Sequence, residues 1–395
     1  MIQKSTKSNP KTAVLLLNMG GPTDISGVEP FLKNIFADPL LLPIKNSLIR
    51  KMVGNIIVSK RLESVKENYR KIGGYSPLIR HTFALTSALN ALDSSKTYSY
   101  AMRYSPPFCK DVLADFKAQG VQDLVLFSLY PQFSTATTYS SLLDAKSCLK
   151  SLEYAPRVSV VEHFSDYMPF YELIADEIIS TLNGAHSKEF VLLLSAHGLP
   201  KSLIEKGDCY VEHCERGKQI IHKILQSRGV DFAKIVLCFQ SKVGPMRWIE
   251  PSTKDTIIAH KHSKIIIYPL AFTIDNSETD YELKIQYKEL ADSLKVRDYR
   301  VCECLNDKEG FAKVIIDLAN QALQKHTTQQ IAPAKSKPKS KIKSAKKPST
   351  KSKHDSKSHK SQKQYKSTKA KPSNKSQQKY SKNPKTNPKK GKSNA

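Results

Sequence analysis

Short apolar runs separated by longer amphipathic stretches constrain the fold of this chain more than any other feature. Segments such as Phe108–Gln119, Tyr171–Leu182 and Arg216–Gln226 have apolar residues at helical spacing. Strands that alternate with helices predict parallel βαβ units, and seven strands over about 315 residues predict two α/β domains. The seven apolar runs are Ala13–Leu17, Tyr98–Met102, Leu124–Leu129, Val158–Val161, Phe190–Leu194, Ile235–Phe239 and Lys264–Tyr268.

The net charge of +27 is concentrated at one end of the chain. Residues 331–395 hold 22 Lys, one acidic residue and no Leu, Val, Phe or Trp, whereas residues 1–330 hold 41 basic and 35 acidic residues. A segment without large apolar side chains cannot offset the entropy cost of ordering, so residues 327–395 are predicted to be a disordered basic tail. Such a tail either binds polyanions, nucleic acid or acidic lipid, or serves as a solubilising extension.

The cysteines and the N-terminus predict a cytoplasmic protein. Seven Cys occur in a chain that shows no secretory signal, and reduced thiols are the default in that compartment. No apolar run approaches the length of about 18 residues that crosses a bilayer. Two cysteine pairs, Cys209 with Cys214 and Cys302 with Cys304, are candidate metal ligands together with His213, although neither pair has the CxxC spacing.

The segment 31–58 differs from the rest of the first half. It is rich in Leu, Ile and Phe, carries interspersed Lys and Arg, and is broken by Pro39 and Pro43. One interpretation is ordinary helix packing. The other is an apolar lip over the pocket of a hydrophobic ligand that also contacts the inner face of a membrane.

Polar and aromatic side chains follow the predicted strands. His197 comes directly after Phe190–Leu194, within Ser195-Ala196-His197-Gly198-Leu199-Pro200. Ligands of open α/β sheets bind at the carboxyl ends of the strands, which places this histidine where chemistry is expected. By itself, such a histidine is more often a turn residue that only satisfies local hydrogen bonds.

Several kinds of site are excluded by missing motifs. No G-x-G-x-x-G opens a helix after the first strand, no P-loop occurs, and no Ser lies in a G-x-S-x-G elbow. The remaining residues suit a large flat apolar ligand with a reactive polar centre. They comprise one His, one Glu, one Arg and several flat or soft side chains, namely His197, Glu278, Arg103, Met19, Tyr104, Tyr130, Phe133, Trp248 and Phe272.

A series of motifs runs in order along residues 11–325. They are Leu16-Leu17-Asn18-Met19-Gly20-Gly21-Pro22, Tyr69-x-x-Ile72-Gly73-Gly74-x-Ser76-Pro77-Leu78, Met102-Arg103-Tyr104, Leu129-Tyr130-Pro131-Gln132, Ser195–Pro200, Lys206-Gly207-Asp208, Phe239–Pro245 with Trp248, Phe272-Thr273-x-Asp275-x-x-Glu278-Thr279, and Cys304-Leu305-Asn306-Asp307. This series resembles the ferrochelatase family, which inserts Fe²⁺ into protoporphyrin in the last step of haem synthesis. The resemblance implies a chelatase-like α/β fold of two similar Rossmann-like domains, residues 11–155 and 156–326, each with a parallel four-stranded sheet and with the porphyrin between them.

By motif position, the resemblance implies that His197 and Glu278 are the catalytic pair and the iron ligands. A histidine can accept the pyrrole protons that leave as the metal enters, and a carboxylate can hold Fe²⁺. The implied porphyrin-binding residues are Met19, Arg103, Tyr104, Trp248 and Phe272. Structural interpretations remain open for three of these residues: core packing for Trp248, a helix-start carboxylate for Glu278 and an ion pair for Arg103.

The chain departs from the family pattern in a few positions. Asn276 stands where many relatives carry His, and Lys242 stands where Arg is frequent. No Cys follows Cys304, so no iron–sulfur cluster, and no cofactor beyond the substrate Fe²⁺, is expected. The alternatives to protoporphyrin ferrochelatase are a coproporphyrin ferrochelatase and a porphyrin- or haem-binding protein without catalysis.

Overall fold

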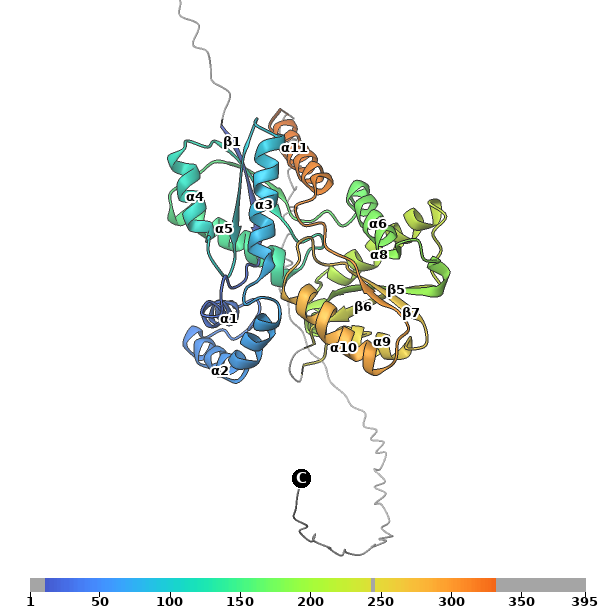
Figure 1. Cartoon of the computed structure of the whole chain (residues 1–395). Coiled ribbons are helices and arrows are strands. Elements are labelled where there is room, and N and C mark those ends of the chain that lie inside the picture. The colour runs from blue at the N-terminus through green and yellow to red at the C-terminus, as the bar shows by residue number, and fades with distance from the viewer. Residues whose placement is uncertain (1–10, 243–245, 332–395) are drawn as a thin grey trace, which may run out of the picture. The chain divides into compact units, whose positions relative to one another are not determined.

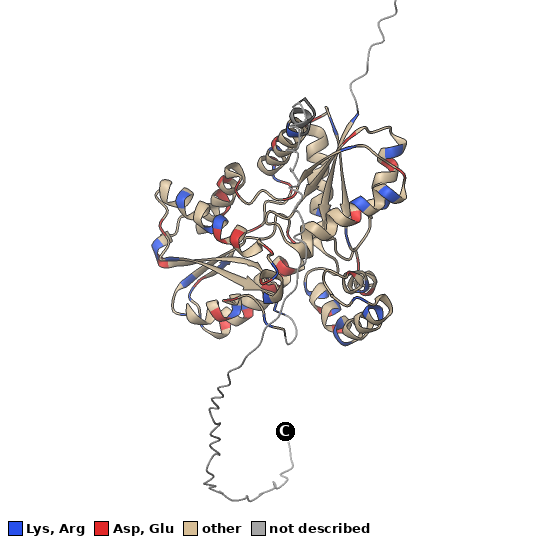
Figure 2. Cartoon of the chain, turned by 180° about the vertical axis from the view of Figure 1, so that it is seen from behind, with Lys and Arg blue, Asp and Glu red and all other residues tan. Residues whose placement is uncertain are grey.

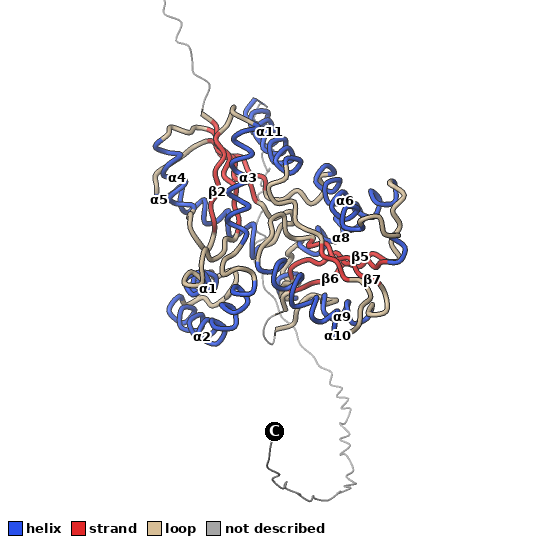
Figure 3. Tube along the Cα trace, viewed as in Figure 1, coloured by secondary structure: helices blue, strands red, loops and turns tan. Residues whose placement is uncertain are grey.

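The computed structural model describes residues 11–242 and 246–331. Of the predicted tail, residues 327–395, the first five belong to the last helix, Glu309–Ile331, and residues 332–395 lie outside the described residues. Figures 1 and 3 show two groups of strands surrounded by helices and joined by loops. The strands are β1 (Thr12–Asn18), β2 (Thr97–Met102), β3 (Asp123–Ser128), β4 (Arg157–Val161), β5 (Phe190–His197), β6 (Lys234–Gln240), β7 (Lys264–Pro269) and β8 (Tyr299–Val301). The helices are α1 (Val28–Ala37), α2 (Ser47–Lys71), α3 (Pro77–Leu92), α4 (Cys109–Ala118), η1 (Thr135–Tyr139), α5 (Ser140–Ser151), α6 (Met168–Leu182), η2 (Ser187–Glu189), α7 (Lys201–Ile204), α8 (Tyr210–Ser227), α9 (Thr253–Ala259), η3 (Glu278–Gln286), α10 (Tyr287–Ser293) and α11 (Glu309–Ile331).

Two parallel four-stranded sheets confirm the predicted fold class. The strand orders are β2-β1-β3-β4 and β6-β5-β7-β8, and each neighbouring pair is parallel. All seven predicted strands are present. The predicted boundary at residues 155 and 156 precedes β4, but β4 pairs with β3 and completes the first sheet. The division into two domains itself stays a prediction.

The central strands of each sheet, β1 and β3 in the first and β5 and β7 in the second, are buried on both faces, which is why they are continuous apolar runs. On the first sheet, Leu15 faces α4 and α5, whereas Leu16 faces a core shared with α3 and α11. On the second sheet, Leu193 faces η3, α9 and α10, whereas Leu194 belongs to the same shared core as Leu16. One apolar cluster therefore runs through the inner faces of both sheets.

The predicted lip, residues 31–58, forms most of the helical pair α1 and α2. Pro39 and Pro43 lie in the turn between the two helices, as the sequence predicts. The pair has its own small core, and the helices approach closely at Gly54, where an added Cβ would lie 3.1 Å from the Cβ of Phe36. Among the described residues, no helix combines the length and the apolar character that a bilayer span requires.

Hydrogen bonds join the loops that follow β3 and β7. The Thr273 hydroxyl donates to the Leu129 carbonyl at 2.8 Å, and the Gln132 amide donates to the Leu270 carbonyl at 3.1 Å. The backbone N–H of Phe133 donates to Nδ1 of His213 on α8 at 3.2 Å. Loops at the carboxyl ends of both sheets are thus held together where the family resemblance implies a site.

The His213 contact predicts a pH dependence of stability. Burial, followed by the neighbouring His163 and Arg216, lowers the pKa of His213, against the opposing effect of Asp166 and Glu212. Because the folded state binds this proton more weakly than the unfolded state, the contribution of His213 is complete above about pH 6.5 and is lost as the pH falls below that value.

Thermal unfolding between pH 7.5 and 5 should therefore depend less on pH in His213→Gln than in the wild type. His222→Gln changes an exposed histidine on the same helix and serves as the matched control. Equal slopes for the wild type and His213→Gln would show that His213 does not titrate with folding.

Candidate active site

His197 is the last residue of β5, and the neighbouring strand holds its backbone in place. Its register partner is Gln240, the last residue of β6, and the N–H of Gly198 donates to the Gln240 carbonyl at 2.8 Å. A Cβ on Gly198 would lie 2.6 Å from that same oxygen, so glycine is required here. The Tyr210 hydroxyl donates to the His197 carbonyl at 3.0 Å.

Phe272 lies against the His197 imidazole, and Trp248 lies beside the residues that follow it. The imidazole ring lies edge-to-face with Phe272, with centroids 6.2 Å apart and an interplanar angle of 89°. Trp248 pairs with Pro200 in an isolated antiparallel bridge, and its ring lies beside Gly198. A small hollow has Gly198, Gln240 and Trp248 in its lining. His197, Trp248 and Phe272 are all partly exposed, so the second sheet presents them together at its carboxyl edge.

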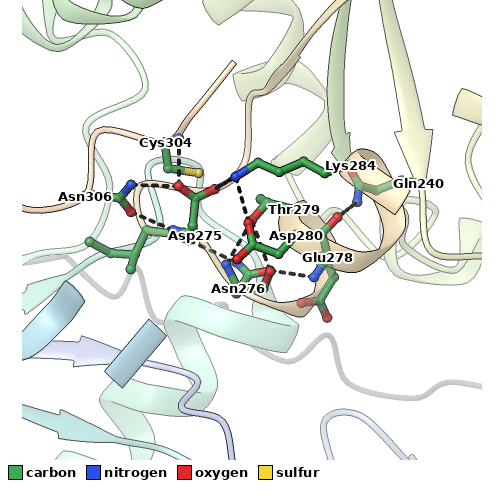
Figure 4. A network of polar contacts seen from close by, with 10 residues as sticks. Gln240, Asp275, Asn276, Glu278, Thr279, Asp280, Lys284, Cys304 and Asn306 are labelled. Atoms are coloured by element: carbon green, nitrogen blue, oxygen red, sulfur yellow. Dashed lines mark hydrogen bonds and ion pairs between the residues drawn. The ribbon is translucent and has the colours of Figure 1, made fainter. Parts of the chain in front are cut away.

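Glu278 opens the π-helix η3, and its backbone is fixed from two sides. Its N–H donates to the side-chain oxygen of Asn276 at 2.8 Å, and its carbonyl accepts from Nε2 of Gln240 at 3.0 Å. Figure 4 shows the carboxylate of Glu278 turned away from these contacts. The Ser277 hydroxyl donates to this carboxylate at 2.9 Å, and the Tyr69 hydroxyl of α2 lies 3.3 Å from that of Ser277.

Gln240 connects the strand end that carries His197 with the helix that carries Glu278. Its Oε1 accepts from the hydroxyl of Ser195 at 2.8 Å, while its Nε2 also donates to Glu282 at 3.1 Å. The side chain is 1 % exposed, so these contacts hold it in one orientation. Gln240 lies in one of the motifs, but nothing in the sequence indicates that it joins the two predicted catalytic residues.

A buried polar network supports the start of η3 (Figure 4). Asp275 accepts from Asn306 at 2.7 Å and from the Cys304 N–H at 3.3 Å, and Lys284 lies 3.9 Å from its other oxygen. Lys284 also pairs with Asp280 at 2.7 Å, one turn away on η3. The network connects η3 to the segment after β8. It therefore fixes the position at which η3 begins, and with it the position of Glu278.

The structure places Arg103 and Tyr104 around a buried carboxylate. Arg103 donates to Asp38 at 3.0 Å, and the Tyr104 hydroxyl donates to the same oxygen at 2.9 Å. Ser140 also donates to Asp38, and Asp144 lies 3.6 Å from the Arg103 guanidinium. Tyr104 is 2 % exposed, so it has almost no surface to offer a ligand in this conformation. The ion-pair interpretation of Arg103 therefore describes its observed contacts.

Met19 lies at the carboxyl edge of the first sheet. It directly follows β1 and is partly exposed, and its carbonyl accepts from the N–H of Tyr104 at 3.0 Å. The predicted residues thus form two groups, one per sheet, and Tyr69 with Ser277 is a contact between the two halves. Asp38, Ser140 and the bridging role of Gln240 were missed, because each depends on partners far apart in the sequence.

The two cysteine pairs that the sequence offers as metal ligands do not gain a third ligand. Within residues 11–242 and 246–331, neither Cys209 with Cys214 nor Cys302 with Cys304 belongs to a group of three converging ligands. Burial raises the pKa of Cys302 to about 12, and Cys304 and Cys214 are likewise fully buried thiols.

A family model and curated relatives both match this chain. The ferrochelatase family model matches residues 11–323. The chain is 51 % identical over 318 residues to the ferrochelatase of Helicobacter pylori strain J99. This match covers 80 % of this chain and 95 % of that protein. It is 47 % identical over 311 residues to the ferrochelatase of Wolinella succinogenes, and this match covers 79 % of this chain and 98 % of that protein. Among solved structures, SirB from Bacillus subtilis with Fe³⁺ matches with a TM-score of 0.47 and 11 % sequence identity. The match covers 81 % of this chain and 97 % of that chain.

Proposed function

The chain belongs to the ferrochelatase family, and on that premise we propose that His197 and Glu278 act on the porphyrin as iron enters it. The family reaction inserts Fe²⁺ into protoporphyrin to form haem. Two pyrrole N–H bonds break, two protons leave, and the oxidation state of the iron does not change. One observation carries the assignment: Gln240 is the register partner of His197 and donates to the carbonyl of Glu278.

His197 serves as the acceptor of a pyrrole proton. A histidine side chain titrates near neutral pH, so its neutral form can take a proton and then release it to solvent. The perpendicular ring of Phe272 limits rotation of the imidazole, and the contacts of the His197 and Gly198 backbone fix its Cα. Orientation of this kind supports proton transfer without reorganisation at each turnover.

Glu278 holds the incoming Fe²⁺ through a carboxylate oxygen and carries the second proton away. Carboxylate oxygens and imidazole nitrogens are both suitable iron ligands. Ser277 donates to the carboxylate, and Tyr69 lies behind Ser277. Burial, together with the charge of Glu278, raises the pKa of Tyr69, so this phenol remains protonated and able to donate.

The porphyrin walls in this proposal are Met19, Trp248 and Phe272, which are partly exposed at the two strand edges. Flat aromatic and soft thioether side chains suit a large apolar ring. Arg103 and Tyr104 act as positioning residues, because their polar atoms are committed to Asp38 and they hold the end of β2 against the end of α1.

The test is an anaerobic assay of Fe²⁺ insertion with protoporphyrin and with coproporphyrin, using the full chain and a chain that ends at residue 331. We expect both chains to form haem from protoporphyrin faster than from coproporphyrin. Faster turnover of coproporphyrin would assign the alternative substrate, and tight porphyrin binding without metallation would indicate a carrier. Loss of activity in the shorter chain would mean that the tail takes part in the reaction.

We further propose that α2 contacts the inner face of a membrane from the cytoplasm. Leu48, Ile49, Met52 and Ile56 are 77 %, 48 %, 58 % and 50 % exposed and follow one face of the helix. Residues 45–61 hold five basic side chains and no acidic one, and Figure 2 shows Lys and Arg along these helices. An exposed apolar face bordered by basic residues suits the surface of an anionic bilayer.

Leu48→Gln combined with Met52→Gln should weaken co-sedimentation with vesicles of phosphatidylglycerol and phosphatidylcholine at least about tenfold, because two apolar side chains lose their burial in lipid. Leu92→Gln, which changes a 45 % exposed leucine on α3, is the matched control. The same measurement on the chain that ends at residue 331 separates vesicle binding by α2 from the proposed binding of acidic lipid by the tail. Unchanged binding of the double variant in that shorter chain would exclude α2 as the contact.

A further inference from the structure

Three potential metal ligands converge on the outer side of the first sheet. The Sγ atoms of Cys109 and Cys148 and a carboxylate oxygen of Asp144 all lie within 4.8 Å of one another, and no other group of three is found in the described part of the chain. Cys109 opens α4, whereas Asp144 and Cys148 lie one turn apart on α5. Residues four apart share a helix face, so α5 presents both ligands toward α4.

The surroundings of this cluster favour a cation. Arg103 faces two carboxylates, Asp38 at 3.0 Å and Asp144 at 3.6 Å, so one guanidinium is shared between two acids. Burial, with a contribution from Asp38, raises the pKa of Asp144 despite Arg103. The Asp144 carboxylate therefore shares its cationic partner with Asp38.

The two thiols already differ in their readiness to ionise. A hydrogen bond from Cys109 lowers the pKa of Cys148, while the same contact, with burial, raises the pKa of Cys109. Cys148 is partly exposed and Cys109 is buried, as is usual where an ion arrives from solvent and is then enclosed. The thiolate is the form that binds metal.

We propose that Cys109, Asp144 and Cys148 form a binding site for a thiophilic divalent cation, with Zn²⁺ as the ion whose preferences they match. Zn²⁺ takes Cys sulfur at about 2.3 Å and carboxylate oxygen at about 2.0–2.2 Å in tetrahedral sites, which places ligand atoms roughly 3.3–3.8 Å apart. A small contraction of the observed cluster reaches that geometry. A water molecule on the exposed side of α5 completes the four ligands.

Binding releases the two thiol protons and leaves two thiolates and one carboxylate around the ion. The cation clamps α4 to α5 and withdraws Asp144 from Arg103, which keeps its contact with Asp38. This site is separate from the proposed iron path, since His197 and Glu278 belong to the second sheet. The competing outcome is a Cys109–Cys148 disulfide, which needs an oxidant that the reaction does not supply and gives Asp144 no role.

The test is a Co²⁺ titration of the reduced full-length chain without oxygen. We expect one Co²⁺ per chain with the intense visible bands of a tetrahedral site and thiolate-to-cobalt charge transfer in the near ultraviolet, both displaced by Zn²⁺. Charge transfer from thiolate identifies this site even if Co²⁺ also binds His197 and Glu278, which have no sulfur. Cys109→Ser and Cys148→Ser should lose these bands, and Asp144→Asn should weaken binding.

Cys209→Ser is the matched control, because Cys209 is also partly exposed but lies outside the cluster, and it should keep the bands. Zn²⁺ should raise the unfolding temperature of the wild type but not of Cys148→Ser, whose own cooperative unfolding shows that it is folded. Bands that persist in both cluster variants, no thiolate bands in the wild type, or a Cys109–Cys148 disulfide that forms instead of the metal complex would each overturn the proposal.

Discussion

Replacing His197 with alanine is expected to lower the rate of iron insertion by about 10²–10⁴-fold, the usual contribution of a positioned acid–base residue. The porphyrin should still bind, because Trp248, Phe272 and Met19 remain. His197 lies at the end of β5, where its backbone contacts do not depend on the imidazole, so the variant should fold normally. Haem formation under anaerobic conditions gives the rate, and quenching of porphyrin fluorescence gives the affinity.

Two controls make this result specific. His222→Ala removes an exposed imidazole on α8 and should leave the rate unchanged. His197→Gln keeps hydrogen bonding but cannot accept a proton at neutral pH, so it should be nearly as slow as His197→Ala. A variant at 197 that binds porphyrin normally and turns over at the wild-type rate would remove His197 from the mechanism.

Asp38→Ala should have the largest effect on stability, a loss on the order of 3 kcal/mol. Asp38 is 3 % exposed and accepts from Arg103, Tyr104 and Ser140, so its removal strands a partly buried guanidinium and a buried phenol. Its other oxygen accepts from the Leu40 N–H at 2.8 Å, at the turn between α1 and α2. The unfolding temperature measured by calorimetry should fall by several degrees.

Asp144→Asn changes the second carboxylate that faces Arg103 and serves as the comparison. This carboxylate is 3.6 Å from the guanidinium and 28 % exposed, so water replaces much of the lost interaction and we expect a cost of about 1 kcal/mol or less. If the two variants lose equal stability, the buried cluster around Asp38 is not the anchor that its contacts indicate.

The sequence was sufficient for seven of the eight described strands, and most clearly for the central strands β1, β3, β5 and β7, because a strand covered on both faces is a continuous apolar run. Strand β8 was missed, since its three residues, Tyr299 to Val301, are only partly buried and include Arg300 at the centre. The π-helices η1 and η3 also gave no signal, because a π-helix differs from an α-helix by hydrogen-bond spacing rather than by composition.

The candidate site divides in the same way. Motif positions were enough to single out His197, Glu278, Trp248 and Phe272, which all lie at the edge of the second sheet. The state of Tyr104 could not be predicted, because its burial depends on Asp38, which follows α1 and lies 66 residues away in the sequence. The Cys109–Asp144–Cys148 cluster was missed for the same reason: its members are spread over two helices and have no recognisable spacing.

The central claim is that His197 and Glu278 act on one reaction centre. A double-mutant cycle of the iron insertion rate with His197→Ala, Glu278→Gln and the combined variant tests it most directly. Residues that act as a unit are strongly non-additive, so the combined variant should be little slower than the slower single variant. Losses that simply multiply, or a single variant with wild-type turnover, would show that the two residues do not share a centre.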